Sequence, residues 1–176
     1  SGIVFPWIGC GKCEACLEHN ETLCEMPKYL GARLNGGYSD HIIVPHSKYI
    51  VSYGDMDPAQ AAPYACSGLT AFSALKKIPL TSKDDWIIII GAGGVGINGI
   101  LLSPATHKAK ILVIDNDPDK RKKAIEAGAN EAFSPDDETE IRNKIGIGAS
   151  AAIDFVGRPE TTDLGLSLVK KGGMVI

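Results

Sequence analysis

Four cysteines stand close together near the start of the chain, in the pattern Cys10-x2-Cys13-x2-Cys16-x7-Cys24. Two-residue spacers let neighbouring thiolates turn toward one ion, and the glycines on either side of Cys10 permit the tight backbone that this needs. Four sulfur ligands make a closed tetrahedral zinc site with no position left for a substrate. The pattern therefore predicts a structural zinc ion rather than a catalytic one.

Two alternatives to zinc stay open for these cysteines. The first three match the C-x2-C-x2-C spacing of bacterial ferredoxins, although the fourth stands at a different spacing and only one such run exists. A brown protein with visible absorption would indicate an iron–sulfur cluster, and a colourless one with a tightly held zinc would support zinc. Four unrelated buried cysteines are the second alternative, which the scarcity of free cysteine in proteins disfavours.

A second motif with chemical meaning is the glycine turn Gly91-Ala92-Gly93-Gly94-Val95-Gly96. In a G-x-G-x-x-G turn between a strand and a helix, the first glycine allows the tight turn and the second lets the backbone approach a pyrophosphate. The third permits close packing of the helix on the strand. Free N–H groups at the start of the helix favour phosphate. Gly91, Gly93, Gly94, Val95 and Gly96 are therefore predicted to bind a dinucleotide.

An acidic residue stands where this motif requires one. Asp115 ends the next apolar run, nineteen residues after Gly96, where a carboxylate would accept hydrogen bonds from the adenosine ribose. The same charge repels a 2′-phosphate and no arginine follows directly, so NAD is favoured over NADP. The alternative is that Asp115 is only a turn residue ahead of Pro118.

These motifs need a parallel sheet to position them. Apolar runs that read as strands alternate with amphipathic helices after residue 80, which predicts an α/β fold with a doubly wound parallel sheet. Pro104 is expected to end its helix near Leu102. The expected strands are residues 87–90, 111–114, 132–133, 151–155 and 174–176, and the expected helices are residues 95–102, 119–127, 138–144 and 161–169.

The first 65 residues have a different character. They are rich in loops and glycine, and their alternating segment Ser39–Val44 predicts a short strand. Asp57 followed by Pro58 predicts a helix start, from which an alanine-rich helix should run toward Lys76.

Composition narrows the function classes. The 176 residues include 18 Lys+Arg and 21 Asp+Glu, a net charge of −3, and 44% hydrophobic residues. This balance lacks the basic footprint of nucleic-acid binders and of membrane-surface proteins. The uncharged stretch 86–107 is broken by glycines and a proline, so it does not predict a membrane span. No secretory signal is visible at Ser1, and a cytoplasmic location is expected.

Taken in order along the chain, the motifs resemble the zinc-dependent medium-chain alcohol dehydrogenases. The matching segments are Pro6–Cys13, Gly36–His41 with Val44–Pro45, Ala65–Thr70, Gly91–Gly96, Val113–Asp115, Glu126–Ala129 and Asp154–Gly157. The resemblance implies that residues 1–65 are part of a GroES-like catalytic domain carrying a structural zinc lobe. It implies an NAD-binding Rossmann domain for residues 66–176.

The resemblance also implies roles for single residues. Cys66 matches a ligand of the catalytic zinc, and Thr70 matches the residue near the nicotinamide, although from sequence alone both read as ordinary helix residues. Further cofactor contacts are implied for Asn116, Lys120, Val156 and Gly157. The four histidines, His19, His41, His46 and His107, match no catalytic position and are interpreted as surface or packing residues.

The implied reaction is hydride transfer between a small primary or secondary alcohol, or a polyol, and NAD, giving an aldehyde or ketone. The resemblance also implies a homodimer or homotetramer for the full-length protein. The family's remaining catalytic-zinc ligands would precede Ser1, and the apolar end Met174–Ile176 would be followed by a further strand. The chain is therefore interpreted as a fragment lacking both ends, inactive by itself. The alternatives are a non-catalytic NAD- and zinc-binding module and, disfavoured by the four cysteines, a zinc-free quinone reductase relative.

Overall fold

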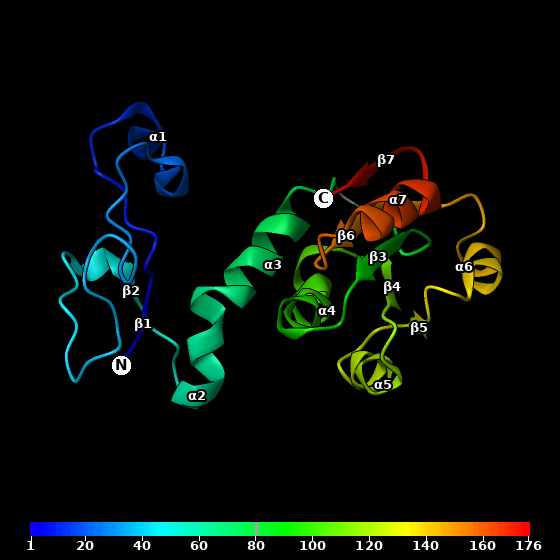
Figure 1. Ribbon diagram of the computed structural model, residues 1–176, viewed down its shortest axis with the longest axis horizontal. Helices are drawn as coiled ribbons and strands as arrows, with labels where there is room; N and C mark the ends of the chain where they lie inside the picture. Colours follow the sequence, from blue (N-terminus) through cyan, green and yellow to red (C-terminus); the bar gives the residue numbers. More distant parts are fainter. Residues whose placement is uncertain (80) are drawn as a thin grey trace. The chain divides into compact units, whose positions relative to one another are not determined.

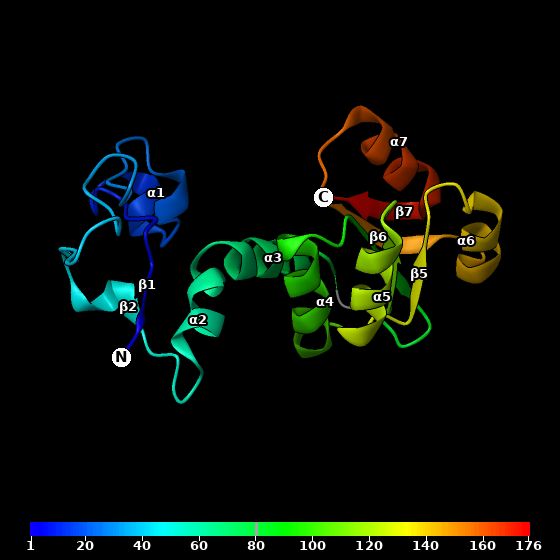
Figure 2. The same cartoon turned by 60° about the horizontal axis from the view of Figure 1, so that its bottom comes forward.

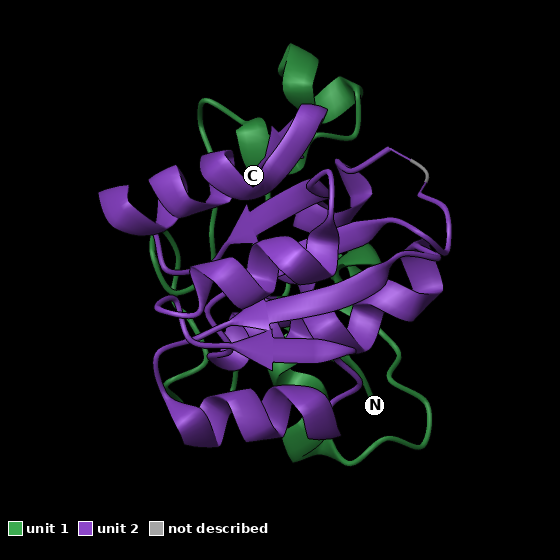
Figure 3. Cartoon of the chain, turned by 90° about the vertical axis from the view of Figure 1, so that its right-hand side faces the viewer, with its two compact units in different colours: residues 1–65 green, residues 66–176 purple. Residues whose placement is uncertain are grey.

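The computed structural model describes residues 1–79 and 81–176, and it divides the chain into two compact units, Ser1–Ala65 and Cys66–Ile176 (Figure 3). Each unit has its own secondary structure and its own buried side chains. Within the described part of the chain, no helix is both long and apolar enough to cross a membrane.

The first unit consists largely of loops and short helical turns. Its strands β1 (Ile3–Val4) and β2 (Ile50–Val51) pair antiparallel. The other elements are α1 (Glu14–Leu17), η1 (Glu21–Leu23), η2 (Ser47–Tyr49), α2 (Pro58–Ala61) and η3 (Ala62–Ala65) (Figure 1). Few side chains are buried, among them Ile8, Tyr49 and two of the cysteines. A unit with so small a core gains much from any additional cross-link.

The strand predicted for Ser39–Val44 is not formed. Within the described residues, no backbone hydrogen bond joins this segment to another strand, and Ile43 is 87% exposed. Alternating polar and apolar residues favour a strand only where a second strand satisfies its backbone groups. The hydroxyl of Ser39 instead donates to the carbonyl of His41, which turns the chain locally.

The predicted helix start at Asp57 is confirmed, but the helix is not continuous. Asp57 Oδ1 accepts hydrogen bonds from the backbone N–H of Ala59 at 2.9 Å and of Gln60 at 3.3 Å, with Pro58 at the first helical position. Pro63 has no N–H to donate to the carbonyl four residues earlier, so the α-helical ladder cannot pass through it. The chain forms η3 there, and α3 (Ser67–Lys76) begins after Cys66.

The second unit is a parallel five-stranded sheet with the order β5-β4-β3-β6-β7 (Figure 1). Its strands are β3 (Trp86–Ile90), β4 (Lys110–Ile114), β5 (Glu131–Phe133), β6 (Ala149–Asp154) and β7 (Val169–Val175). Every residue of β3 is buried, as expected for a strand covered on both faces. The predicted α/β class with a parallel sheet is confirmed.

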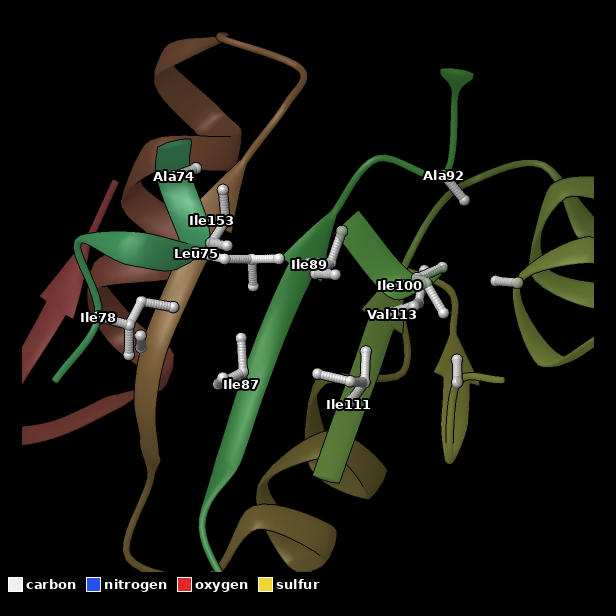
Figure 4. Close-up of a cluster of buried hydrophobic side chains, with 13 residues drawn as sticks. Ala74, Leu75, Ile78, Ile87, Ile89, Ala92, Ile100, Ile111, Val113 and Ile153 are labelled. Carbon is white, nitrogen blue, oxygen red and sulfur yellow. The ribbon is translucent and has the colours of Figure 1, made fainter. Parts of the chain in front are cut away.

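Helices cover both faces of this sheet, which Figure 2 shows from a second side. They are α3, α4 (Gly94–Thr106), α5 (Pro118–Glu126), α6 (Glu138–Ile145) and α7 (Pro159–Leu168). On one face, Ile89 packs in a cluster with Leu75 of α3 and Ile100 of α4 (Figure 4). On the other, Ile88 belongs to a cluster with Ile141 of α6. Ile88 and Ile89 lie in different clusters because successive side chains of a strand point to opposite faces of the sheet.

The prediction that Pro104 ends its helix near Leu102 is wrong, because α4 continues to Thr106. Pro104 has no N–H to donate to the carbonyl of Ile100, but it lies inside the helix and does not end it. The last turn is retained because the Thr106 hydroxyl donates to the carbonyl of Ser103 at 3.1 Å, and the N–H of His107 donates to the same oxygen at 2.8 Å.

The other predicted elements of the second unit agree with the structure to within about two residues, except at the end of the chain. The last strand begins at Val169, directly after α7, and not at Met174. Its pairing with β6 is irregular, because Ala149 pairs with Val169 whereas Ala151 pairs with Met174. Gly172, at φ +78°, takes up the extra residues in a conformation that glycine adopts readily.

The amino edge of the sheet is held by an ion pair. Asp85, just before β3, accepts hydrogen bonds from Ser150 Oγ of β6 at 2.6 Å and from Lys170 Nζ of β7 at 2.8 Å. The lysine contact, followed by those from Ser150 and the N–H of Ser82, holds the pKa of the Asp85 carboxyl below its usual range. These contacts stabilise the amino ends of the strands. Parallel α/β sheets bind ligands at the other end, outside the carboxyl ends of the strands.

Candidate functional site

The four cysteines of the first unit come together around one point. Cys13 is the residue before α1, Cys16 lies within α1, and Cys24 directly follows η1. These short helical turns fold the loop back on itself, so the sulfur atoms of Cys10, Cys13, Cys16 and Cys24 all lie within 4.8 Å of one another. Cys16 and Cys24 are buried.

The spacing of the sulfurs fits a single ion. Cys10 Sγ and Cys16 Sγ are 4.0 Å apart, and Cys13 Sγ and Cys24 Sγ are 3.7 Å apart. Zinc bound tetrahedrally at about 2.3 Å places its sulfur ligands about 3.8 Å apart. An iron–sulfur cluster distributes its thiolates over several irons and would hold them farther apart. The donor set and its geometry therefore fit a structural zinc ion.

Backbone N–H groups and a glycine lie against the cysteine cluster. The N–H groups of Lys12 and Cys13 lower the pKa of the Cys10 thiol to about 6, whereas burial raises the pKa of Cys16 to about 11. Gly9 lies against the cluster, because a Cβ at this position would stand 2.5 Å from Cys16 Sγ. Only glycine leaves room for the thiol there.

Glu21 connects this cluster to the rest of the first unit, and no motif in the sequence predicted it. Its Oε2 accepts hydrogen bonds from the N–H of Gly9 at 2.8 Å and from the Tyr49 hydroxyl at 2.7 Å. Its Oε1 accepts from Lys48 Nζ at 2.7 Å. Lys48 first, then Tyr49 and Gly9, lower the pKa of Glu21 to about 2. No local spacing indicated these contacts, because Glu21 and Lys48 are far apart in sequence.

This lowered pKa predicts a pH dependence of stability. The Glu21 pKa falls from 4.5 to about 2 on folding, so its contribution is complete above about pH 4.5 and is lost as the pH falls toward 2. We expect Glu21→Gln to lower the Tm of the first unit by roughly 5 °C at neutral pH.

The difference in Tm between wild type and Glu21→Gln should shrink progressively as the pH falls from about 4.5 to about 2, the two pKa values of the carboxyl group. The exposed Glu25, next to Cys24, supplies the control Glu25→Gln, which should melt like wild type at each pH. A difference that stays constant with pH would contradict the role of the Glu21 charge.

In the second unit, the glycine turn joins β3 to α4 as predicted. Gly91 has φ +92°, and its N–H donates to the carbonyl of Ile114 at 2.8 Å. Gly96 is packed against the turn, because a Cβ there would stand 1.9 Å from the carbonyl oxygen of Gly91. A Cβ at Gly93 would meet nothing within 4 Å. The backbone at Gly93 is therefore open on the side where a ligand can approach.

The start of α4 has no side-chain cap, because the residue before the helix is Gly93. The first N–H groups of a helix lack partners within it, and together with the helix dipole they favour phosphate. The turn thus provides the groups that a pyrophosphate requires.

Asp115 lies next to this turn and is 7% exposed. Its Oδ2 accepts a hydrogen bond from the N–H of Ala92 at 2.8 Å, and its Oδ1 accepts from the N–H of Asp117 at 2.9 Å. Asp115 is therefore a turn residue. Each carboxylate oxygen can accept a further hydrogen bond, so this role leaves capacity for a ribose hydroxyl.

A cavity of about 540 Å³ opens at the carboxyl ends of β3, β4 and β6, the edge at which parallel α/β sheets bind ligands. Five of the ten residues predicted to bind the cofactor line it: Gly91, Asp115, Asn116, Lys120 and Val156. The other five, which are Gly93, Gly94, Val95, Gly96 and Gly157, are not among its lining residues.

The cavity also has lining residues that were not predicted from the sequence, among them Pro135, Arg158, Glu160 and Thr161. Arg158 directly precedes α7 and Thr161 lies in its first turn. Their position in the segment that follows the carboxyl end of β6 is the signal that could have identified them. Lys120 and Arg158 bring positive charge to the same cavity as the acids Asp115 and Glu160. A ligand with both hydroxyl and phosphate groups fits this set.

Cys66 and Thr70 lie at the start of α3. The N–H of Thr70 donates to the carbonyl of Cys66 at 2.9 Å, and both side chains are exposed. Within the described residues, the group of potential metal ligands that lie close together consists of the four clustered cysteines and does not include Cys66.

A larger hollow of about 790 Å³ lies in the first unit, along residues 30–45. It contains none of the predicted site residues. Its lining includes the exposed segment in which the predicted strand is not formed. The cavity at the carboxyl ends of the strands is smaller, but it combines charged side chains with five of the residues predicted to bind the cofactor, and it is therefore the better candidate site.

Comparison with known proteins agrees with this geometry. A family model described as "Alcohol dehydrogenase GroES-like domain" matches residues 2–54, and one described as "Zinc-binding dehydrogenase" matches residues 94–176. An NAD-dependent alcohol dehydrogenase of Sulfolobus acidocaldarius is 35% identical over 99% of this chain and 51% of its own length. A D-arabinose 1-dehydrogenase (NADP(+)) of Saccharolobus solfataricus is 32% identical over 99% of this chain and 52% of its own length.

Solved structures show the same likeness. The D-arabinose dehydrogenase from Sulfolobus solfataricus superposes with a TM-score of 0.85 at 29% identity, covering 98% of this chain and 55% of that one. The alcohol dehydrogenase from Aeropyrum pernix gives a TM-score of 0.85 at 25% identity, with 98% and 52% covered. The chain spans about half the length of the curated relatives it matches.

Proposed function

The chain belongs to the zinc-dependent medium-chain alcohol dehydrogenase family, and from this premise we propose that its protein is an NAD-dependent oxidoreductase. The reaction is hydride transfer between a small primary or secondary alcohol, or a polyol, and NAD, giving an aldehyde or ketone. The observation that carries the proposal is the cavity where Gly91, Asp115 and Val156 meet at the carboxyl ends of three strands.

In this proposal, Asp115 accepts hydrogen bonds from the adenosine ribose, and the turn from Gly91 to Gly96, including Gly94 and Val95, receives the pyrophosphate at the start of α4. Asn116, Lys120, Val156 and Gly157 flank the adenosine. Bound there, the nicotinamide supplies the hydride acceptor, and a catalytic zinc supplies Lewis acidity toward the alcohol oxygen.

We assign the remaining residues in the same way. Cys10, Cys13, Cys16 and Cys24 hold a structural zinc, supported by sulfur spacings that suit a tetrahedral ion. Cys66 is assigned as a ligand of the catalytic zinc and Thr70 as a residue near the nicotinamide. Residues 1–65 are assigned to part of the GroES-like catalytic domain and residues 66–176 to the NAD-binding domain. A cytoplasmic location and a homodimer or homotetramer complete the proposal.

The turnover test uses the zinc-loaded protein, NAD and a panel of small primary and secondary alcohols and polyols, with absorbance of the reduced nicotinamide as the readout. For these 176 residues alone we expect binding without turnover, since Cys66 is the only catalytic-zinc ligand that the family resemblance assigns to them. The rival hypothesis, a non-catalytic module that binds NAD and zinc, predicts no turnover by the whole protein either.

Cofactor preference is tested at Asp115. We expect Asp115→Asn to raise the Kd for NAD at least about tenfold, because a charged acceptor of ribose hydroxyls is lost. The same change should improve NADP relative to NAD by removing repulsion of the 2′-phosphate. Titration calorimetry with both dinucleotides measures this.

The matched control for this experiment is Asp119→Asn, which neutralises an exposed acid nearby in α5 and should bind both dinucleotides like wild type. An unchanged affinity of Asp115→Asn for NAD would contradict the assignment of Asp115 to the cofactor.

A further inference from the structure

Asp154, the last residue of β6, accepts hydrogen bonds from four donors in the segment that follows it. Its Oδ1 accepts from the N–H of Val156 at 2.8 Å and of Gly157 at 3.1 Å. Its Oδ2 accepts from the hydroxyls of Thr161 at 2.8 Å and Thr162 at 3.2 Å. Burial opposes ionisation, but these donors, led by the N–H of Gly157, hold the pKa of Asp154 below its usual value.

These hydrogen bonds shape one wall of the cavity, formed by Val156, Arg158 and Thr161. Gly157 has φ +73°, so the chain turns sharply within the segment that Asp154 holds. The Thr161 hydroxyl accepts from the N–H of Arg158 at 3.1 Å while it contacts Asp154. The backbone of Arg158 is thus tied to Asp154 through Thr161.

The same wall touches the glycine turn directly. A Cβ at Gly91 would stand 2.7 Å from Val156 Cγ2, so Val156 packs against the first glycine of the turn. The N–H of Phe155 donates to the carbonyl of Ile90 at 2.9 Å, which joins the two strand ends just before the wall begins. A shift of Val156 would therefore change the space beside the turn.

We propose that Asp154 is a positioning residue for cofactor binding: it holds the wall of Val156 and Arg158 beside the glycine turn and thereby sets the affinity for the ADP-ribose half of the dinucleotide. This inference rests on the proposed function. Asp154 does not line the cavity, and it acts through the segment 156–161. A carboxylate suits this task because it accepts several hydrogen bonds at once, and charge strengthens each of them.

A purely structural role predicts something different. Four hydrogen bonds at a strand end would then contribute to the melting temperature, and ligand affinity would change little once the protein is folded. A positioning role predicts weaker binding at temperatures well below unfolding. It also predicts that an acceptor of the same shape restores most of the affinity, because asparagine keeps an oxygen for the N–H groups of Val156 and Gly157.

The experiment compares Asp154→Ala and Asp154→Asn with wild type. The control is Asp163→Ala, which removes an exposed acid from α7. Calorimetry with ADP-ribose and with NAD gives the Kd of each, measured below the Tm of every variant. Hydrogen exchange of the Val156 and Gly157 amides reports on the wall without any ligand.

For Asp154→Ala we expect the Kd of both probes to rise by roughly 10- to 100-fold, with faster exchange of both amides. Asp154→Asn should stay within about fivefold of wild type, since one acceptor oxygen remains. Asp163→Ala should bind like wild type. Unchanged binding by Asp154→Ala would overturn the proposal, as would Asp154→Asn binding as weakly as Asp154→Ala.

Failure of the proposed function gives a separate result. If wild type binds neither ADP-ribose nor NAD, the assignment of the cavity to a dinucleotide is wrong. The exchange rates of the Val156 and Gly157 amides still decide whether Asp154 holds the wall, and slow exchange in Asp154→Ala would overturn that part.

Discussion

Replacement of Cys24 by serine is expected to release the structural zinc and to unfold the loop that carries the cysteine cluster. Serine is a much poorer zinc ligand than a thiolate, and three sulfurs do not close the tetrahedral site. Zinc binding by four-ligand sites contributes on the order of 10 kcal/mol to folding. Apart from the contacts of Glu21, the first unit has little to hold this loop, because its few buried side chains include Cys16 and Cys24 themselves.

Two measurements check this result. Metal analysis should show the zinc content of Cys24→Ser falling by one equivalent per chain, and limited proteolysis should cut between residues 10 and 30. The control is Glu18→Gln, an exposed acid at the end of α1 that is outside the sulfur cluster and should leave both readouts unchanged. Full zinc retention by Cys24→Ser in the presence of a chelator would contradict the four-sulfur site.

The second large effect concerns the glycine turn. Gly96→Ala is expected to destabilise the second unit by at least about 3 kcal/mol, because its Cβ would stand 1.9 Å from the carbonyl oxygen of Gly91. Backbone cannot move aside as a flexible side chain can, so α4 must separate from β3. A loss of this size lowers the Tm by roughly 10 °C or more.

The paired variant is Gly93→Ala in the same turn. Its Cβ would meet nothing within 4 Å, so the protein should melt within about 2 °C of wild type. The methyl group stands where the backbone is open to a ligand, and we expect NAD affinity to fall at least about tenfold. Thermal melting and calorimetry separate the two variants. A stable Gly96→Ala, or unchanged NAD affinity in Gly93→Ala, would show that these glycines have other roles.

The cysteine cluster illustrates what can be predicted from local spacing. The intervals between Cys10, Cys13 and Cys16 are short enough that any compact turn brings their thiols together, so their convergence follows from the chain itself. Cys24 reaches the other thiols only after the chain has turned at α1 and η1, but just seven residues separate it from Cys16. Glu21 lies within this same loop, but its partners Gly9, Lys48 and Tyr49 come from other segments. No interval in the sequence indicated that contact.

Predictions from the local sequence were wrong where contacts with another part of the chain decide the secondary structure. The alternation in Ser39–Val44 describes a strand, but pairing depends on a second segment that does not lie beside it among the described residues. Pro104 removes one hydrogen bond from α4, and the Thr106 hydroxyl and the N–H of His107 compensate one turn later. Pro63, in contrast, does end an α-helical run. At Pro104 those two donors close the last turn of α4 through the carbonyl of Ser103, even though the carbonyl of Ile100 loses the N–H of residue 104 as a donor.

The sequence by itself indicated the resemblance to the alcohol dehydrogenase family, the α/β class, the four clustered cysteines and the glycine turn with Asp115 at the end of the next strand. Those features depend on residue types and on short intervals between residues. They are therefore present in any fold that forms the same helices, strands and turns. Only the tertiary structure decided that Asp115 also holds the glycine turn, that Arg158 and Thr161 share its cavity, and that Asp154 holds their wall. The first two are contacts between strand ends that lie far apart in the chain, and parallel pairing of β4, β3 and β6 brings them together. The hydrogen bonds of Asp154 stay within its own segment, and the sheet decides only that this segment lies beside the glycine turn.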